Sequence, residues 1–145
     1  LYFMQGLNLT PLHGHTALFG VYGMLGVGLM LFCLRGMKPA AEWSEPLLRT
    51  SFWSFNIGLA GMALMTLLPI GVLQLIAAIK HGYWYARSAE FMQQPLIDLL
   101  VWMRVPGDVI FSVGAMALTW FVARLWIAPR KPAPVGAVGQ ETVRS

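Results

Sequence analysis

The sequence predicts an all-α fold, a transmembrane helical bundle with three membrane-spanning helices. Hydrophobic residues make up 57% of the 145 residues, whereas charged residues make up only 11%. A soluble domain carries about 25% charged residues, so this chain has too few charges to cover a surface that faces water. Three long stretches contain no charged residue. The high hydrophobicity excludes intrinsic disorder, and the single cysteine, Cys33, excludes a disulfide scaffold.

The first charge-free stretch runs over residues 16–34 and is closed by Arg35. As a helix it is about 28 Å long, which is close to the thickness of a bilayer core. Thr10 is a candidate N-cap, and Pro11 suits the first position of a helix because its missing N–H is not needed there. We therefore expect the first span at about residues 11–35.

The second and third spans are both expected to be irregular. The second charge-free stretch, residues 50–79, is longer than a bilayer requires, which predicts a tilted or kinked span at about 49–80, with the kink near Pro69 and Gly71. The third has its core at 109–123 and is expected to extend over about 96–127. Pro106 and Gly107 should bend or break it near one membrane face.

The rest of the chain is expected to connect or follow these spans. Residues 36–49 and 80–94 are predicted loops, and the second loop contains Tyr83, Trp84 and Tyr85, which suit the headgroup region. Residues 1–128 form a single three-helix membrane domain in this interpretation. Residues 129–145, rich in Pro, Gly, Ala and Val, are expected to be a disordered cytoplasmic tail. Residues 1–6, LYFMQG, resemble the scar of a protease tag.

Positive charges predict the orientation of the chain. The net charge of +4 does not indicate nucleic-acid binding, because the cations are spread over loops and the tail and form no basic face. By the positive-inside rule, the side with more Lys and Arg is cytoplasmic. The first loop and the C-terminus should therefore be cytoplasmic and the N-terminus periplasmic. The cations on the cytoplasmic side are Arg35, Lys38, Arg49, Arg124, Arg130, Lys131 and Arg144, against Lys80, Arg87 and Arg104 on the other.

Two histidines, His13 and His15, lie where the first span begins. Residues two apart are separated by about 200° on an α-helix, so the two imidazoles should point to opposite faces and cannot chelate one ion. They can serve two separate metal centres, and Gly14 between them would let a large planar cofactor approach the backbone closely. The alternative is that both histidines only hydrogen-bond to water or lipid headgroups.

The string LTPLHGHTALFGVYGMLGVGLMLFCLRG, residues 9–36, is more specific than the histidine pair. It resembles the haem-ligand helix near the C-terminus of the large subunit of bacterial nitric oxide reductases of the quinol-dependent type, in the haem–copper oxidase superfamily. SFWSFNIGLAGMALMTLLPIGVLQ, YWYARSAEFM and WMRVPGDVIFSVGA resemble the next helix, the following loop and the last helix. The resemblance covers residues 7–125.

The resemblance implies a role for each histidine. His13 would be the proximal ligand of the high-spin haem b3, and His15 an axial ligand of the low-spin haem b. The family reaction joins two nitric oxide molecules, with two electrons and two protons, to give nitrous oxide and water. A bacterial cytoplasmic membrane and quinol or cytochrome c as electron donor are also implied. No catalytic residue is expected in this chain beyond the haem b3 ligand.

The chain departs from the family pattern in its length. The family's ligands for a non-haem iron, and the second axial histidine of haem b, lie on earlier helices whose motifs are absent here. The chain is therefore expected to be part of a larger polytopic subunit, to need its remaining helices and the membrane lipid as partners, and to be inactive alone. The open alternatives are a terminal oxidase subunit that reduces oxygen and a non-catalytic membrane scaffold or remnant.

Other polar residues receive structural interpretations. Arg104 could pair with haem propionates, but an i,i+4 helix pair with Asp108 is favoured. Asn56 and Gln74, polar residues within the second span, are expected to bridge helices by hydrogen bonds.

Three further residues also receive structural interpretations. His81 and Glu90 are expected to be solvated loop residues, with a proton path from outside as the alternative role for Glu90. Cys33 is expected to be buried.

Overall fold

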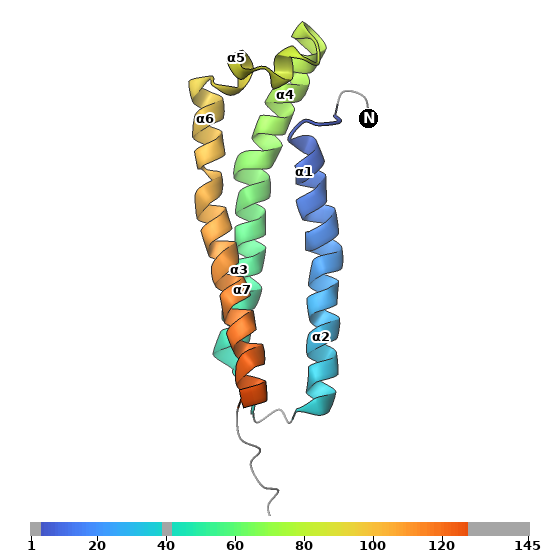
Figure 1. Ribbon diagram of the computed structural model, residues 1–145, viewed down its shortest axis with the longest axis vertical. Helices are drawn as coiled ribbons and strands as arrows, with labels where there is room; N and C mark the ends of the chain where they lie inside the picture. The colour runs from blue at the N-terminus through green and yellow to red at the C-terminus, as the bar shows by residue number, and fades with distance from the viewer. Residues whose placement is uncertain (1–3, 39–41, 128–145) are drawn as a thin grey trace, which may run out of the picture.

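A computed structural model describes residues 4–38 and 42–127, which are almost entirely helical and contain no strand. Three helices are long and apolar enough to cross a membrane, Leu9–Met37, Glu45–His81 and Pro95–Ile127. They run side by side along one axis (Figure 1) and confirm the predicted fold class. The expected spans 11–35, 49–80 and 96–127 fall within them. The tail predicted at 129–145 and the first three residues of LYFMQG lie outside the described residues.

The first long helix consists of α1 (Leu9–His13), the π-helix η1 (Gly14–Gly23) and α2 (Met24–Met37). It begins two residues earlier than expected. The N-cap position is Asn8, and the hydroxyl of Thr10 donates a hydrogen bond to the carbonyl of Met4 (2.9 Å) instead of capping the helix. The expected cap at Thr10 was wrong, because Asn8 is held by a partner far along the chain, as described below.

The second long helix consists of α3 (Glu45–Gly61), the π-helix η3 (Met62–Leu67) and α4 (Leu68–His81). Its irregularity lies in η3, just before the expected kink at Pro69. Proline has no N–H for the carbonyl four residues earlier, and the π-helical pairing, which is rare and usually short, occupies the segment that precedes it. The helix also starts at Glu45, so the connection after Met37 is shorter than the loop expected at 36–49.

The third long helix follows a short connection that contains η4 (Tyr85–Arg87) and α5 (Ala89–Met92). It consists of α6 (Pro95–Trp102) and α7 (Arg104–Ile127), with an interruption at Met103. The break expected at Pro106 and Gly107 therefore lies a few residues earlier. Pro106 is in the first turn of α7, where a missing N–H is tolerated.

Glycines allow α3 and α7 to pack closely. A Cβ on Gly58 would lie 2.7 Å from the backbone nitrogen of Phe111 and 2.8 Å from the carbonyl oxygen of Gly107. A Cβ on Gly114 would lie 3.1 Å from the backbone nitrogen of Phe55. Both distances are shorter than carbon and nitrogen or oxygen atoms tolerate, so only glycine fits at this seam. Small residues at helix contacts are typical of packing within membranes.

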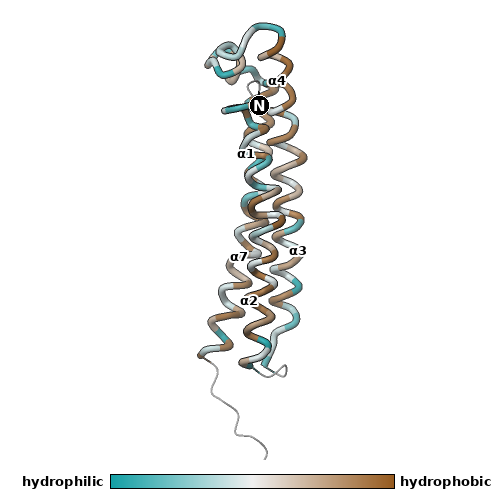
Figure 2. The backbone as a smooth tube through the Cα atoms, turned by 90° about the vertical axis from the view of Figure 1, so that its right-hand side faces the viewer, coloured by the Kyte–Doolittle hydropathy of each residue, from teal (hydrophilic) through white to brown (hydrophobic). Residues whose placement is uncertain are grey.

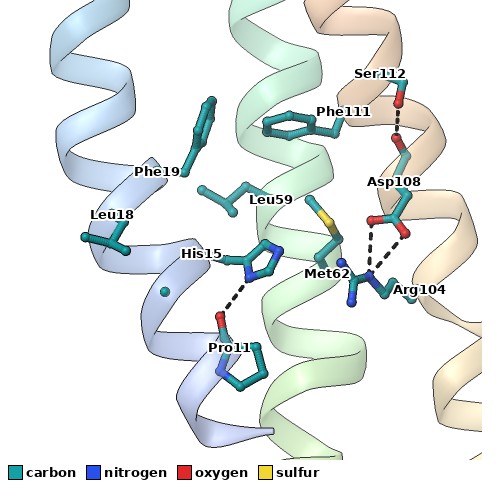
Figure 3. A pocket seen from close by; sticks show the side chains of 11 residues that line it. Pro11, His15, Leu18, Phe19, Leu59, Met62, Arg104, Asp108, Phe111 and Ser112 are labelled. Carbon is teal, nitrogen blue, oxygen red and sulfur yellow. Dashed lines mark hydrogen bonds and ion pairs between the residues drawn. The ribbon is translucent and has the colours of Figure 1, made fainter.

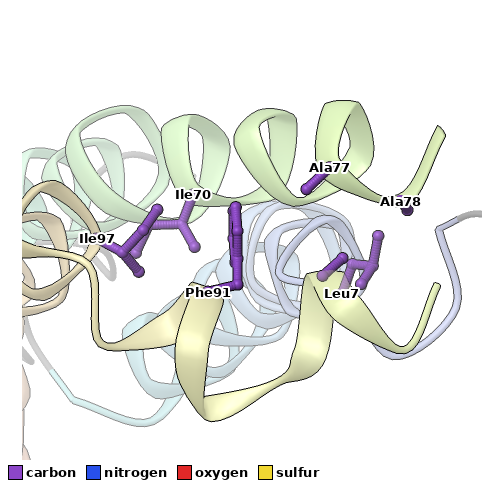
Figure 4. Close-up of a cluster of buried hydrophobic side chains, with 7 residues drawn as sticks. Leu7, Ile70, Ala77, Ala78, Phe91 and Ile97 are labelled. Atoms are coloured by element: carbon purple, nitrogen blue, oxygen red, sulfur yellow. The ribbon is translucent and has the colours of Figure 1, made fainter. Parts of the chain in front are cut away.

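The first long helix contacts the other two mainly near its ends. At the end that carries His81, Leu7 is buried in a cluster with residues of α4, α5 and α6 (Figure 4). At the end that carries Met37, Leu34 packs against Phe121 and Leu125 of α7. Between these contacts the helix is largely exposed: only 6% of its most apolar window is buried, against 50% for the second helix. The middle of the bundle is mainly hydrophobic (Figure 2), so this exposed surface suits lipid or further helices.

Candidate functional site

His15 lies at the start of η1 and lines a cavity of about 750 Å³ between the first helix and the α3–α7 pair. The volume is within the range of cavities that hold small-molecule cofactors, about 300–1,000 Å³. Residues from all three long helices form its walls (Figure 3): Pro11, Gly14, His15, Leu18, Phe19, Leu59, Met62, Arg104, Asp108, Phe111 and Ser112. We call this space the His15 cavity.

The backbone of its own helix orients the His15 ring. Nδ1 of His15 lies 2.7 Å from the carbonyl oxygen of Pro11. A carbonyl only accepts hydrogen bonds, so Nδ1 is the protonated nitrogen, and in the neutral ring the lone pair is on Nε2. Metal-binding histidines use this arrangement, in which one ring nitrogen donates to a carbonyl while the other binds the metal. The His15 ring is therefore prepared to act as an axial ligand.

The walls of the His15 cavity combine apolar side chains with one ion pair. Nε of Arg104 donates to both carboxylate oxygens of Asp108, at 3.3 and 3.1 Å. The favoured interpretation of these residues as an i,i+4 pair is confirmed. The pair lies on the rim of the cavity and is partly exposed, 39% for Arg104 and 46% for Asp108. Apolar walls with an arginine at the rim fit a porphyrin, whose ring is apolar and whose propionates are anionic.

Three phenylalanine rings, one from each long helix, pack together next to the His15 cavity. The ring centroids of Phe19 and Phe111 are 4.9 Å apart, those of Phe55 and Phe111 also 4.9 Å, and those of Phe19 and Phe55 5.8 Å. Phe19 and Phe111 line the His15 cavity, whereas Phe55 lines a second cavity of about 450 Å³ towards the Met37 end. The rings therefore lie between the two cavities and hold the three helices together at this level.

His13 faces a different space. It is exposed and lines a recess of about 490 Å³ with Met4, Gln5, Leu9 and Thr10, none of which lines the His15 cavity. A Cβ on Gly14 would meet no atom within 4 Å, so the backbone between the histidines is uncovered. The π-helix that begins at Gly14 changes the angle that a regular α-helix would give, but the two imidazoles still line separate spaces. Within residues 4–38 and 42–127, no three side chains of His, Cys, Asp or Glu come together.

The remaining singled-out residues fall into two groups. His81 and Glu90 are exposed, and the His81 ring lies 5.1 Å from that of Tyr85. Cys33 is also exposed, so its expected burial was wrong, because this part of the first helix is largely uncovered. Asn56 does not bridge helices: its side-chain nitrogen donates to Phe52 of its own helix (2.8 Å).

Gln74 does connect separate segments, in more ways than its position in a span predicted. It is 4% exposed and bonds to Asn8, Ala86 and Met92. Its polar character within an apolar helix was visible in the sequence, but its partners were not, because two of them lie in connections that sequence patterns describe poorly.

Comparisons with known proteins add two findings. The family model described as Cytochrome C and Quinol oxidase polypeptide I matches residues 1–110, which include both histidines and Gln74. A nitric oxide reductase subunit of Stutzerimonas stutzeri is 26% identical to the chain over 121 residues, which are 78% of this chain and 24% of that protein. The chain thus spans about a quarter of the length of this relative.

Proposed function

Because the chain belongs to the Cytochrome C and Quinol oxidase polypeptide I family, we propose that it is part of a membrane reductase that converts nitric oxide to nitrous oxide. In this proposal His13 is an axial ligand of haem b3 and His15 an axial ligand of haem b. The similarity to the nitric oxide reductase of Stutzerimonas stutzeri favours nitric oxide as the substrate. The three helices long enough to cross a membrane suit a multi-pass membrane protein of this family.

The separation of the two histidines supports the proposal most strongly. One helix presents the imidazoles to two spaces that share no lining residue. A helix of this kind can bring an electron-supplying centre and a reaction centre close to each other without letting them share a ligand. When bound, haem supplies one-electron redox chemistry and an iron that can bind a diatomic gas.

The chain's own residues then have positioning roles. The Pro11 carbonyl keeps Nδ1 of His15 protonated and fixes the ring, which raises the basicity of the ligating nitrogen. Phe19 and Phe111 exclude water from the apolar side of the His15 cavity. The guanidinium of Arg104 provides positive charge at the rim, where propionates could pair with it.

The proposed reaction requires partners outside this chain. Each histidine provides one ligand to its haem, and the non-haem iron of the reaction would be held by other helices of the same subunit. The exposed apolar surface of the first helix, which includes Leu18, Tyr22 and Phe32, suits those helices and the surrounding lipid. We propose quinol or cytochrome c as electron donor, a bacterial cytoplasmic membrane as the location, and a periplasmic N-terminus. The chain alone should be inactive.

Reduction of oxygen by a related terminal oxidase is the second candidate. It is favoured by the description of the matching family model, which names oxidases. Both candidates use the same arrangement of axial histidines, so gas consumption must separate them.

The test measures nitric oxide and oxygen consumption by membranes from cells that express the native gene. We expect nitric oxide consumption to be lost in His13→Ala and in His15→Ala. His81→Ala is the matched control, because His81 is exposed and lies outside both cavities. Oxygen consumption that depends on both histidines, with no nitric oxide consumption, would favour the oxidase. Gas consumption that is unchanged in both variants would favour a scaffold.

A further inference from the structure

Gln74 is a buried amide in an otherwise apolar helix, and all of its hydrogen-bonding groups have partners. Its Oε1 accepts from the backbone N–H of Asn8 (2.8 Å) and from the side-chain nitrogen of Asn8 (3.0 Å). Its Nε2 donates to the carbonyl of Ala86 (3.2 Å) and lies 3.3 Å from the sulfur of Met92. Because the Asn8 N–H can only donate and the Ala86 carbonyl can only accept, the amide has one possible orientation.

These bonds connect three segments that are distant in sequence. Asn8 directly precedes α1, Gln74 lies in α4, and Ala86 and Met92 lie in the connection that leads to α6. The backbone N–H of Asn8 comes just before the helix that carries both histidines. A partner on another helix therefore holds the beginning of the histidine helix, and no side chain of its own caps it.

A close backbone contact lies one turn from this amide. A Cβ on Gly71 would be 2.8 Å from the backbone nitrogen of Leu9, so the histidine helix approaches α4 too closely for any other residue. Leu7, 1% exposed, is buried beside the same part of α4. Figure 4 shows Leu7 opposite Ala77 and Ala78. Contact at Gly71 and Leu7 brings the helices together, but apolar contacts are not directional, whereas the hydrogen bonds of Gln74 fix height and rotation.

We propose that Gln74 is a positioning residue for the histidine helix: its bonds to Asn8 and Ala86 set the height and rotation at which His13 and His15 are presented. The inference rests on the proposed function, because it concerns ligands of haem. The first helix has few other attachments at this end, since most of its length is exposed. His15 follows Asn8 by only seven residues, so a shift at Asn8 is transmitted through less than two helical turns.

The experiment compares two substitutions of Gln74 with one control in membranes from cells that express the native gene. Gln74→Met keeps the length of the side chain but removes the amide. Gln74→Glu keeps an acceptor for Asn8 and, when protonated in apolar surroundings, a donor for Ala86. Asn56→Leu is the control, because Asn56 lies in the same long helix, is exposed, and bonds only to its own helix. The readouts are backbone hydrogen exchange over residues 4–12 and the electron paramagnetic resonance spectrum of the low-spin haem.

We expect exchange over residues 4–12 to be about tenfold faster in Gln74→Met than in the unsubstituted protein, since one buried hydrogen bond is lost at Asn8. The low-spin haem spectrum should shift and broaden because the ring of His15 is rotated. Gln74→Glu should restore most of both signals, and Asn56→Leu should change neither.

Two results would overturn the inference. One is faster exchange with an unchanged haem spectrum in Gln74→Met, which would leave Gln74 with a purely structural role. The other is an unchanged exchange rate. Failure of the unsubstituted protein to bind haem is a separate outcome, because it would contradict the proposed function, and the inference would fall with it.

Discussion

Gly58→Ala should separate α3 from α7 and destabilise the bundle. The added Cβ would lie 2.7 Å from the backbone nitrogen of Phe111, 2.8 Å from the carbonyl oxygen of Gly107 and 2.8 Å from the Cβ of Phe111. All of these atoms belong to the backbone or are attached directly to it, so no rotation of a side chain can relieve the contact. The helices must move apart by roughly 0.7 Å to restore van der Waals distances.

The magnitude follows from a comparison with Gly36→Ala. Gly36 lies in α2, and a Cβ added there would meet no atom within 4 Å. Both substitutions gain up to about 1 kcal/mol of helix propensity, so this gain cancels in the difference between them. What remains is the cost of overpacking, about 1–3 kcal/mol. Gly58→Ala should therefore be less stable than Gly36→Ala by about this amount.

The assay is reversible unfolding of the purified chain in mixed micelles, in which the free energy of unfolding is measured as the fraction of denaturing detergent rises. Because Phe111 lines the His15 cavity, the walls of that cavity should move in Gly58→Ala as well. Equal free energies of unfolding for the two variants would refute the reasoning, since the backbone contact at Gly58 would then have no cost.

Three further predictions follow from the described contacts. Phe19→Leu should lower the free energy of unfolding by about 1–3 kcal/mol, because it removes two ring pairs, with Phe55 and Phe111; no change in the same micelle assay would contradict this. Asp108→Asn should lower it by no more than about 0.5 kcal/mol, since the ion pair with Arg104 is partly exposed, and a loss of several kcal/mol would show that the pair has another structural role. Cys33, exposed on α2, should react with a membrane-impermeant maleimide faster in inverted vesicles than in right-side-out vesicles, and the opposite order would reverse the proposed orientation.

The number and approximate limits of the long helices could be predicted because they follow from where charges are absent. Arg35 and Arg49 border apolar runs, and a bilayer needs a minimum helix length whatever the neighbouring helices do. The exact ends could not be predicted, because they depend on partners distant in sequence. The first helix starts at Leu9 and not at Pro11 since Asn8 bonds to Gln74.

The candidate site was predictable in its ligands but not in its surroundings. The spacing of His13 and His15 indicated two separate spaces, and the residue types suggested metal binding. The π-helical segments η1 and η3 could not be read from the sequence, because π-helical pairing depends on local backbone strain and neighbouring contacts that leave no pattern. The role of the Pro11 carbonyl in orienting His15 depends on the same local geometry.

The most direct test of the central claim, that one helix provides ligands to two different haems, is the absorption and electron paramagnetic resonance spectrum of membranes with single histidine substitutions. His13→Ala should remove the high-spin signal and leave the low-spin signal, whereas His15→Ala should do the reverse. Loss of the same signal in both variants would show that the two imidazoles serve one centre and would contradict the account.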